Sequence, residues 1–152
     1  MLKDSTNASN NLFVGGTGND SLYGSYNSDT YVFNLGDGVD SIVETGSYTG
    51  AVDVLDFGEG IEAESIWLSR SGNDLKLQVL GTDDSVSIKN WYSSSSAQVE
   101  EIHVADGLAL SASQVQNLVN AMASFGVPAG GEGNLTVGQR QQLDVFIAAN
   151  WQ

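Results

Sequence analysis

The chain has 152 residues, enough for one domain with a core and too few to make two domains the first expectation. Five Lys and Arg against nineteen Asp and Glu give a net charge of -14, so the chain repels nucleic acid and anionic membrane surfaces. Because 41% of the residues are hydrophobic, the composition argues against disorder, and the excess of acidic side chains is consistent with a bound cation.

The chain contains no cysteine, which excludes disulfides and thiolate metal sites. A small extracellular protein without disulfides needs another means of stabilisation, and a bound metal is the usual one. No apolar run approaches the roughly 20 residues of a membrane span, and residues 1–11 lack the regions of a cleaved signal peptide. This is compatible with a cytosolic protein, with a trimmed sequence or with export by a C-terminal address, and the early start of the first motif suggests a piece of a larger protein.

From residue 11 to 44 the sequence is rich in Gly, Asn and Asp, which favours turns and short strands over helix. Residues 15–23 match the calcium-binding nonapeptide G-G-x-G-x-D-x-U-x at every specified position. The glycines allow positive φ angles and let carbonyl groups approach an ion, Asp20 supplies a charged oxygen, and Leu22 points inward from a short strand.

Two further copies follow this nonapeptide. Residues 24–32 keep Gly24, Asp29 and Tyr31 but have other residues at two glycine positions, and residues 35–42 restore G-x-G-x-D-x-U after a two-residue insertion.

Calcium takes roughly six to eight oxygens, more than one turn offers, so two stacked turns must share an ion. Alternate turns lie on one edge, which predicts a first site formed by Asp20 and Asp40 with the carbonyls of Gly16, Gly18, Gly36 and Gly38. A second site on the opposite edge is predicted from Asp29 with Asp53. The alternative is a structural turn without metal, disfavoured because unpaired carboxylates at close range repel each other.

Residues 52–104 read as β-strands, with alternation over 75–79 and 86–88 and a hairpin loop at 81–84. Trp67 and Trp91 are expected to close the core. His103 is expected on a strand surface. Four further acids are expected on a solvated face and not as ligands: Glu62, Glu64, Glu100 and Glu101.

After residue 110 the period becomes helical. Ser111 with Gln114 fits a capping box before an apolar face of Val115, Leu118, Val119, Met122 and Phe125, and Gly126 and Pro128 end this helix. Thr136 with Gln139 begins a second helix, whose predicted face is Leu143, Phe146, Ile147 and Trp151. Residues 127–134 are expected to be a flexible link. Both helices are short enough that they must dock on something.

These motifs resemble the RTX (repeats-in-toxin) family with its haemolysin-type repeats. Residues 29–33 and 36–44 look like the transition that follows such repeats, residues 72–75, 89–92 and 102–107 look like the repeat-associated domain, and residues 148–152 look like a terminus read by type I secretion machinery. The resemblance implies a mainly β fold: a short right-handed parallel β-roll with calcium between its turns, continuing into a β-rich cap, with one or two short C-terminal α-helices. Residues 12–110 would form the roll and cap, and residues 111–152 a helical, secretion signal-like tail.

The function implied is a non-catalytic module of a secreted, extracellular protein, with calcium ions, the type I secretion machinery and the upstream domains of its parent as partners. With one His, no Cys and no nucleophile or phosphate-binding motif, enzyme activity is not expected. The alternative is an adhesive or polysaccharide-binding accessory module, in which Trp67 or Tyr92 would contact the ligand.

Overall fold

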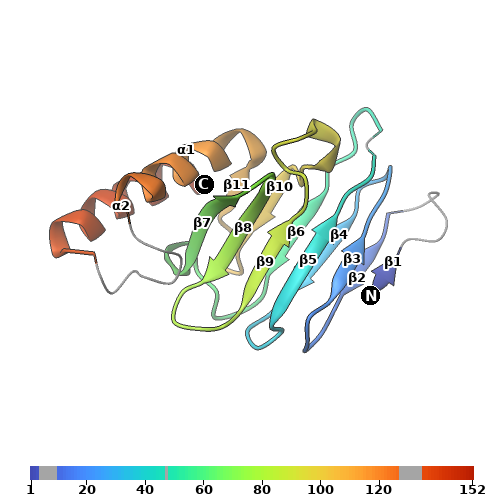
Figure 1. Ribbon diagram of the computed structural model, residues 1–152, viewed down its shortest axis with the longest axis horizontal. Coiled ribbons are helices and arrows are strands. Elements are labelled where there is room, and N and C mark those ends of the chain that lie inside the picture. The colour runs from blue at the N-terminus through green and yellow to red at the C-terminus, as the bar shows by residue number, and fades with distance from the viewer. Residues whose placement is uncertain (4–9, 47, 127–134) are drawn as a thin grey trace.

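Two β-sheets and two C-terminal helices make up the computed structural model, which describes residues 1–3, 10–46, 48–126 and 135–152 (Figure 1). Sheet A has the strand order β1 (Leu2–Lys3), β3 (Ser21–Tyr23), β5 (Val39–Val43), β9 (Ser85–Ile88), β8 (Asp74–Val79), β7 (Ile66–Ser71). Sheet B has the order β11 (Ala109–Ser111), β10 (Glu101–His103), β6 (Val54–Phe57), β4 (Thr30–Phe33), β2 (Leu12–Val14).

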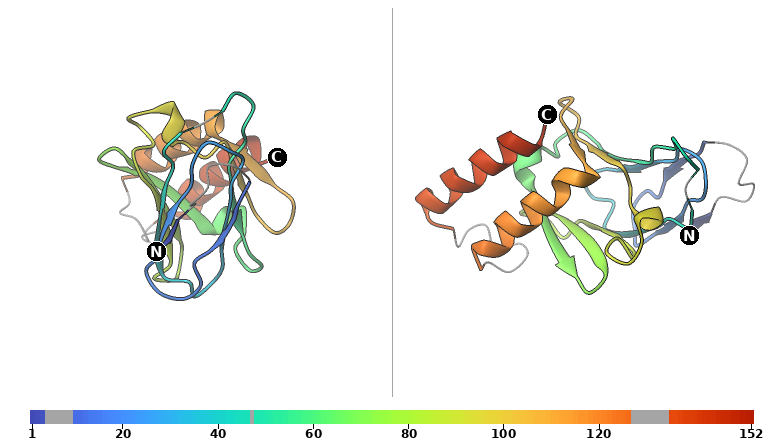
Figure 2. Two further views of the ribbon diagram at one scale, coloured as in Figure 1. Left: turned by 90° about the vertical axis from the view of Figure 1, so that its right-hand side faces the viewer. Right: turned by 90° about the horizontal axis from the view of Figure 1, so that it is seen from above.

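Consecutive strands from β1 to β6 alternate between the two sheets, and neighbours within each sheet are parallel, as are β9 and β10 with their partners β5 and β6. We call one sheet A strand and the sheet B strand that follows it a coil. Inward side chains of successive coils stack in register, with Phe13 opposite Tyr31 and Tyr31 opposite Leu55. The rings of Phe13 and Tyr31 are parallel, with centroids 5.1 Å apart. The two sheets face each other across this column (Figure 2).

Glycine turns keep the strands short. Gly18 and Gly38 form a bridge between two coils, and a Cβ on Gly38 would lie 2.2 Å from the carbonyl oxygen of Gly18. No side chain fits there, so this turn must contain glycine for the coils to approach.

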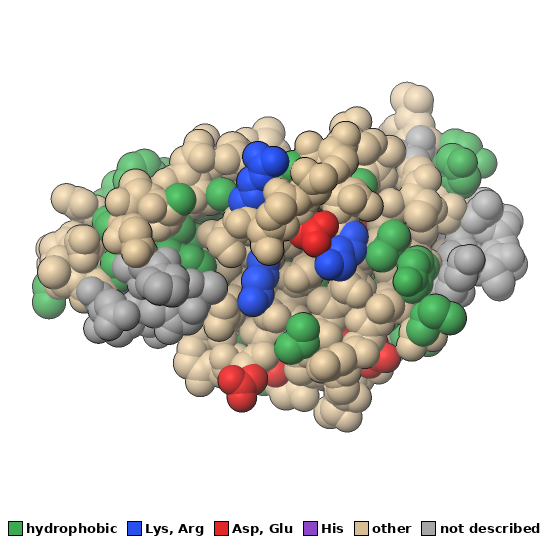
Figure 3. Space-filling model, in the orientation of Figure 1, with side chains coloured by type: hydrophobic (Ala, Val, Ile, Leu, Met, Phe, Trp, Pro, Cys, Tyr) green, Lys and Arg blue, Asp and Glu red, His purple; other side chains and the backbone are tan. Residues whose placement is uncertain are grey.

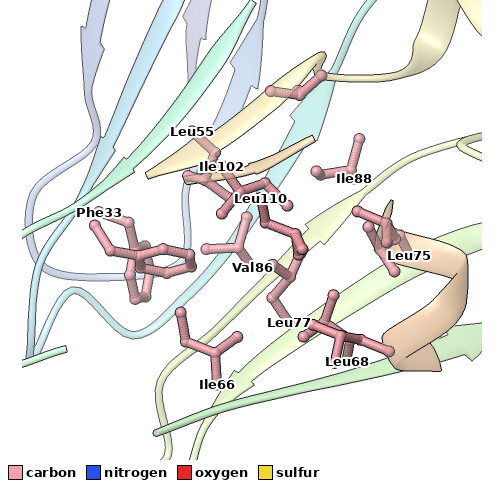
Figure 4. Close-up of a cluster of buried hydrophobic side chains, with 14 of the residues drawn as sticks. Phe33, Leu55, Ile66, Leu68, Leu75, Leu77, Val86, Ile88, Ile102 and Leu110 are labelled. Carbon is pink, nitrogen blue, oxygen red and sulfur yellow. The ribbon is translucent and has the colours of Figure 1, made fainter. Parts of the chain in front are cut away.

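The β7–β8 hairpin is inserted between β6 and β9 and extends sheet A with antiparallel strands. The predicted hairpin loop at 81–84 is confirmed, because β8 and β9 pair across it. Trp67 and Trp91 are buried as predicted, at 2% and 3% exposure. The core where the hairpin meets both sheets is aliphatic, with Leu55 and Ile102 of sheet B facing Val86 and Leu77 of sheet A (Figure 4). Two 3-10 helices, η1 (Ala63–Ser65) and η2 (Ser95–Ala97), connect strands near this core.

Both predicted helices are present: α1 (Ala112–Ser124) and α2 (Val137–Asn150). Their capping boxes are formed as expected, with the backbone nitrogens of Ser111 and Thr136 donating to Gln114 and Gln139 at 3.1 and 2.9 Å. The helices lie at one end of the sheets (Figure 2), and α1 packs against β7, where the Leu68 nitrogen lies 3.1 Å from the Met122 sulfur. None of the described helices is long and apolar enough to cross a membrane.

The second helix docks through a narrower face than predicted. Leu143, Ile147 and Trp151 are buried, but Phe146 is 47% exposed, so its assignment to the buried face was wrong. Asn150 takes that place, because its side chain bridges to Asn117 of α1 at 3.0 Å. After Trp151, the Gln152 backbone exchanges two hydrogen bonds with Ala109, of 3.0 and 2.9 Å, at the free edge of β11.

The prediction of a mainly β fold with C-terminal helices is confirmed. The two sheets remain open and separate, and the right-handed parallel β-roll stays a prediction. The division at residue 110 also stays a prediction, and the helices share one hydrophobic core with the sheets. The expected flexible link at residues 127–134 lies outside the described residues.

Candidate metal centre

Seven of the eight predicted ligands lie on the loops at the two ends of the stacked strands, and Asp40 is the second residue of β5. The loops 15–20, 34–38 and 80–84, which precede β3, β5 and β9, form what we call the first edge. The loops 24–29, 44–53 and 89–100, which precede β4, β6 and β10, form the second edge. The structure therefore separates the eight predicted ligands into the same two groups as the sequence did.

On the first edge, Asp20 and Asp40 belong to successive coils. The Asp20 nitrogen donates to Oδ1 of Asp40 at 2.8 Å, and Asp40 is 2% exposed. Oδ2 of Asp40 is buried without a partner among the described residues. A Cβ on Gly15 would lie 3.1 Å from this oxygen and 3.3 Å from Oδ2 of Asp20, so both carboxylates point to the same place. Burial raises the pKa of Asp40, and the charges of the neighbouring acids raise it further, partly offset by the hydrogen bond from Asp20.

The four predicted glycines form the first-edge turns in the left-handed conformation, with φ of 76° at Gly16, 132° at Gly18, 86° at Gly36 and 99° at Gly38. Two of the carbonyls already accept backbone hydrogen bonds: Gly18 from Val39 at 3.2 Å, and Gly38 from Ser85 at 2.9 Å. A carbonyl oxygen has a second lone pair, so these bonds leave room for a metal. Their role as ligands stays a prediction.

Sequence reasoning missed Asp84 on this edge, because residues 81–84 were interpreted only as a hairpin loop. Asp84 is 7% exposed and accepts from the nitrogens of Gly36 and Gly38 at 2.8 and 3.1 Å. Its carboxylate therefore orients the turn that carries two of the predicted ligands.

On the second edge, the structure brings Asp29 and Asp53 together and adds Glu44. One oxygen from each of the three lies within 4.8 Å of the others, and the side chains are 0%, 1% and 5% exposed for Asp29, Asp53 and Glu44. Two oxygens on opposite sides of a calcium ion are separated by about 4.6 to 5.2 Å, twice the ordinary bond length. The three acids are thus close enough to bind one ion.

Glu44 is the acid of this cluster that the sequence did not reveal. The Tyr31 hydroxyl donates to its Oε1, and its Oε2 is buried without a partner among the described residues. Burial raises the pKa of Glu44 to about 9 and that of Asp53 to about 7, and repulsion from the other acids of this edge contributes to both shifts. Burial beside Glu44 also raises the pKa of Tyr31.

The absence of a side chain at Gly24 allows the Glu44 carboxylate to lie beside Asp29 and Asp53. The pairing of Tyr23 with Val43 places the following residues, Gly24 and Glu44, at equivalent positions of two successive coils. A Cβ on Gly24 would lie 1.8 Å from the Tyr31 hydroxyl, 2.2 Å from Oε1 of Glu44 and 2.9 Å from Oδ2 of Asp29. The missing side chain of one coil therefore makes room for the carboxylate of the next. Counting this register along the chain is the signal that would have identified Glu44.

A series of hydrogen bonds, which we call the ladder, connects the coils along the second edge. The Asn11 nitrogen donates to Asp29, the Asp29 nitrogen to Asp53 and the Asp53 nitrogen to Glu100, at 2.9, 2.8 and 2.7 Å. Glu100 was expected on a solvated face, and this was wrong, because its half-buried carboxylate holds the Asp53 backbone. Glu62 and Glu64 are exposed as expected, and His103 lies on the outer side of β10, 2.7 Å from Glu101.

Cationic side chains do not compensate the buried acids. Among the ion pairs between described residues, none involves Asp29, Glu44, Asp53, Asp40 or Asp84. Few acidic side chains reach the surface on the face drawn in Figure 3, although the chain has nineteen. Burying several carboxylates without a cation is costly, so this arrangement suits a hard divalent ion with oxygen ligands. The orphaned oxygen of Glu44 fits such an ion.

Comparison with known proteins agrees with a calcium-binding character. Residues 74–114 match the family model of the haemolysin-type calcium binding protein related domain. This match covers β8 to β11 and the start of α1, and it does not include Asp29, Glu44 or Asp53. The chain is also similar to the iron-regulated protein FrpA of Neisseria meningitidis serogroup C, with 34% identity over 93 residues. That alignment covers 59% of this chain and 8% of the length of FrpA.

Proposed function

We propose that this chain is a calcium-dependent folding, capping and export module of a secreted bacterial RTX protein. The observation that carries the proposal is the cluster of Asp29, Glu44 and Asp53, buried within 4.8 Å of one another without a basic partner among the described residues. The match to a haemolysin-type calcium binding related domain supports calcium as the ion. Asp29, Glu44 and Asp53 would hold one ion on the second edge, and Asp20 and Asp40 with the carbonyls of Gly16, Gly18, Gly36 and Gly38 another on the first.

Calcium binding would be coupled to folding. Without the ion, the acids must be either protonated or left charged in a site of low dielectric constant, and both reduce stability near neutral pH. A ligand that binds only the folded state stabilises it by mass action, by about 2.7 kcal/mol at one hundred times Kd. Millimolar calcium outside the cell would therefore favour the folded chain, whereas a low-calcium cytosol would leave it unfolded and ready for export.

The assignment of roll, cap and tail follows the same proposal. The alternation of parallel strands between two sheets supports a β-roll over residues 12–57, and the β7–β8 hairpin with β11 and the helices would cap its open end. Residues 111–152 would be recognised by the type I secretion machinery before folding. Deleting residues 126–152 from the parent protein should abolish its secretion, and undiminished secretion would refute the export role.

The polysaccharide alternative gains no support at the residues first assigned to it. Trp67 is buried in the core. Tyr92 is half-buried, and the guanidinium of Arg70 lies 4.4 Å from its ring centroid, covering one face. Neither ring is open to a sugar.

The test is a calcium titration of the complete chain, followed by circular dichroism and calorimetry. We expect β structure to increase with calcium and to be lost with chelator. The variants Asp29→Asn with Asp53→Asn, and Asp20→Asn with Asp40→Asn, should each lose one class of binding site. The control is Asp83→Asn, which removes an exposed acid next to Asp84 and should titrate like the parent. A spectrum that is indifferent to chelator, with both double variants binding calcium as the parent does, would contradict the proposal.

A further inference from the structure

Two loops of the second edge, 24–29 and 44–53, expose no charged side chain among their described residues. All three acids of the loops 24–29 and 44–53 are buried in the cluster. The described side chains of these loops that reach solvent are neutral: Tyr26, Asn27, Ser28, Thr45, Tyr48, Thr49 and Val52. In a chain with a net charge of -14, this is a distinct surface of aromatic rings, hydroxyls and amides. Figure 1 shows the longer of the two loops, between β5 and β6, projecting beyond the ends of the strands.

Tyr26 and Tyr48 form an aromatic pair on this surface. Their ring centroids are 5.1 Å apart with an interplanar angle of 30°, and they are 39% and 56% exposed. The Tyr48 nitrogen donates to the Tyr26 carbonyl at 3.0 Å, so the backbone sets the spacing of the rings. Gly46 lies against the ring of Tyr26, where a Cβ would come within 2.6 Å of it.

We propose that the described residues of the loops 24–29 and 44–53 form a binding surface for a neutral polysaccharide, with Tyr48 and Tyr26 as its stacking platform. A fixed tyrosine offers a flat apolar face at little cost in conformational entropy, and the nearby Ser and Thr hydroxyls can exchange hydrogen bonds with sugar hydroxyls. A polyanionic ligand would meet no cationic side chain in these loops, and a protein partner would meet little apolar surface beyond the two rings and Val52.

This site is distinct from the calcium cluster, although the same loops carry both. Asp29, Glu44 and Asp53 face inward from these loops, and the two tyrosines are exposed outside. If calcium orders the loops, it also orders the platform, and chelator should weaken polysaccharide binding. The tyrosine variants should leave calcium affinity unchanged, so the two proposals can fail separately.

The test is native affinity electrophoresis of the complete chain in gels containing hydroxyethyl cellulose, dextran or galactomannan, with alginate as the charged comparison and calcium in all gels. We expect retardation by at least one neutral polymer, and Tyr48→Ala should weaken the affinity about tenfold, the factor that corresponds to about 1.4 kcal/mol. Tyr48→Phe keeps the ring and should stay within about twofold of the parent.

Tyr23→Ala is the matched control, because this half-buried tyrosine lies on β3 of sheet A, outside both loops. Calcium calorimetry and circular dichroism of each variant confirm the fold. Retardation that Tyr48→Ala and Tyr26→Ala leave unchanged, no retardation by any neutral polymer, or retardation by alginate alone would each overturn the proposal.

Discussion

The backbone nitrogen of Asp29 donates a hydrogen bond of 2.8 Å to the carboxylate of Asp53, which occupies the equivalent position one coil later. The same contact joins Asp20 to Asp40 on the other edge, also at 2.8 Å. In Asp40, one oxygen therefore holds the neighbouring coil, and the other has no partner among the described residues and remains for a ligand.

Replacing Glu44 by Gln should separate calcium binding from stability without calcium. Because burial raises the pKa of Glu44 to about 9, the metal-free protein at pH 7 holds this side chain protonated, and Gln imitates that state. We expect the melting temperature in chelator to change little and the calcium affinity to fall about tenfold or more, since a charged ligand is lost. Glu59→Gln, at an exposed acid, is the control. Equal calcium affinity in parent and Glu44→Gln would remove Glu44 from the site.

Stability without calcium should decrease as the pH rises. The folded-state pKa values of Glu44 and Asp53 are raised to about 9 and about 7 from ordinary values of 4.5 and 3.8, so the folded chain binds more protons than the unfolded chain between these limits. Their contribution is fully present below pH 4 and is lost as the pH rises through about 7 and then about 9. Thermal melts in chelator at pH 5, 7 and 9 should show decreasing melting temperatures, less steeply in Glu44→Gln. A melting temperature that increases over this range would contradict the assignment.

Gly24→Ala should destabilise the protein by about 2 kcal/mol or more, because the added methyl group overlaps the Tyr31 hydroxyl and both nearby carboxylates. Gly138→Ala is the matched control: Gly138 lies in α2, where an added Cβ would meet nothing within 4 Å, and Ala should stabilise the helix by about 0.5 to 1 kcal/mol. Urea denaturation in calcium measures both changes. If Gly24→Ala left the stability unchanged, the Glu44 carboxylate would not lie against residue 24.

Trp151→Ala should cost about 3 to 5 kcal/mol, because this side chain is 2% exposed in the same core as the sheets. Val145→Ala changes an α2 side chain that is 69% exposed and should stay within about 0.5 kcal/mol of the parent. Urea denaturation of the two variants makes the comparison. Equal stability would show that the end of the chain does not dock on the core.

The sequence predicted the structural features that depend on residues close together in the chain. The capping boxes at Ser111 and Thr136, the hairpin before β9 and the positive φ angles of the nonapeptide glycines depend on residues a few positions apart. Asp29 and Asp53 could be paired because the repeats suggested alternate edges.

The remaining members of the clusters depend on register between coils of unequal length. Glu44 follows β5 as Gly24 follows β3, so counting the register of the repeats could have identified it, but a whole hairpin intervenes before Asp84 and Glu100. Repeat spacing is lost at this hairpin, so Asp84 and Glu100 could be assigned only from the paired strands. Phe146 was misassigned for a related reason. The helical period predicts which side of α2 is apolar, but the packing of α2 against the core decides how many of those side chains are buried.

The ladder of the second edge has a direction. Each donor, from Asn11 to Asp29 to Asp53, lies one coil before its acceptor, and Glu100 accepts last. Every coil is thus oriented by the carboxylate of its successor. Removing the coil nearest the N-terminus would leave all later rungs intact, whereas removing β10 and its preceding loop would leave the Asp53 nitrogen without its carboxylate acceptor.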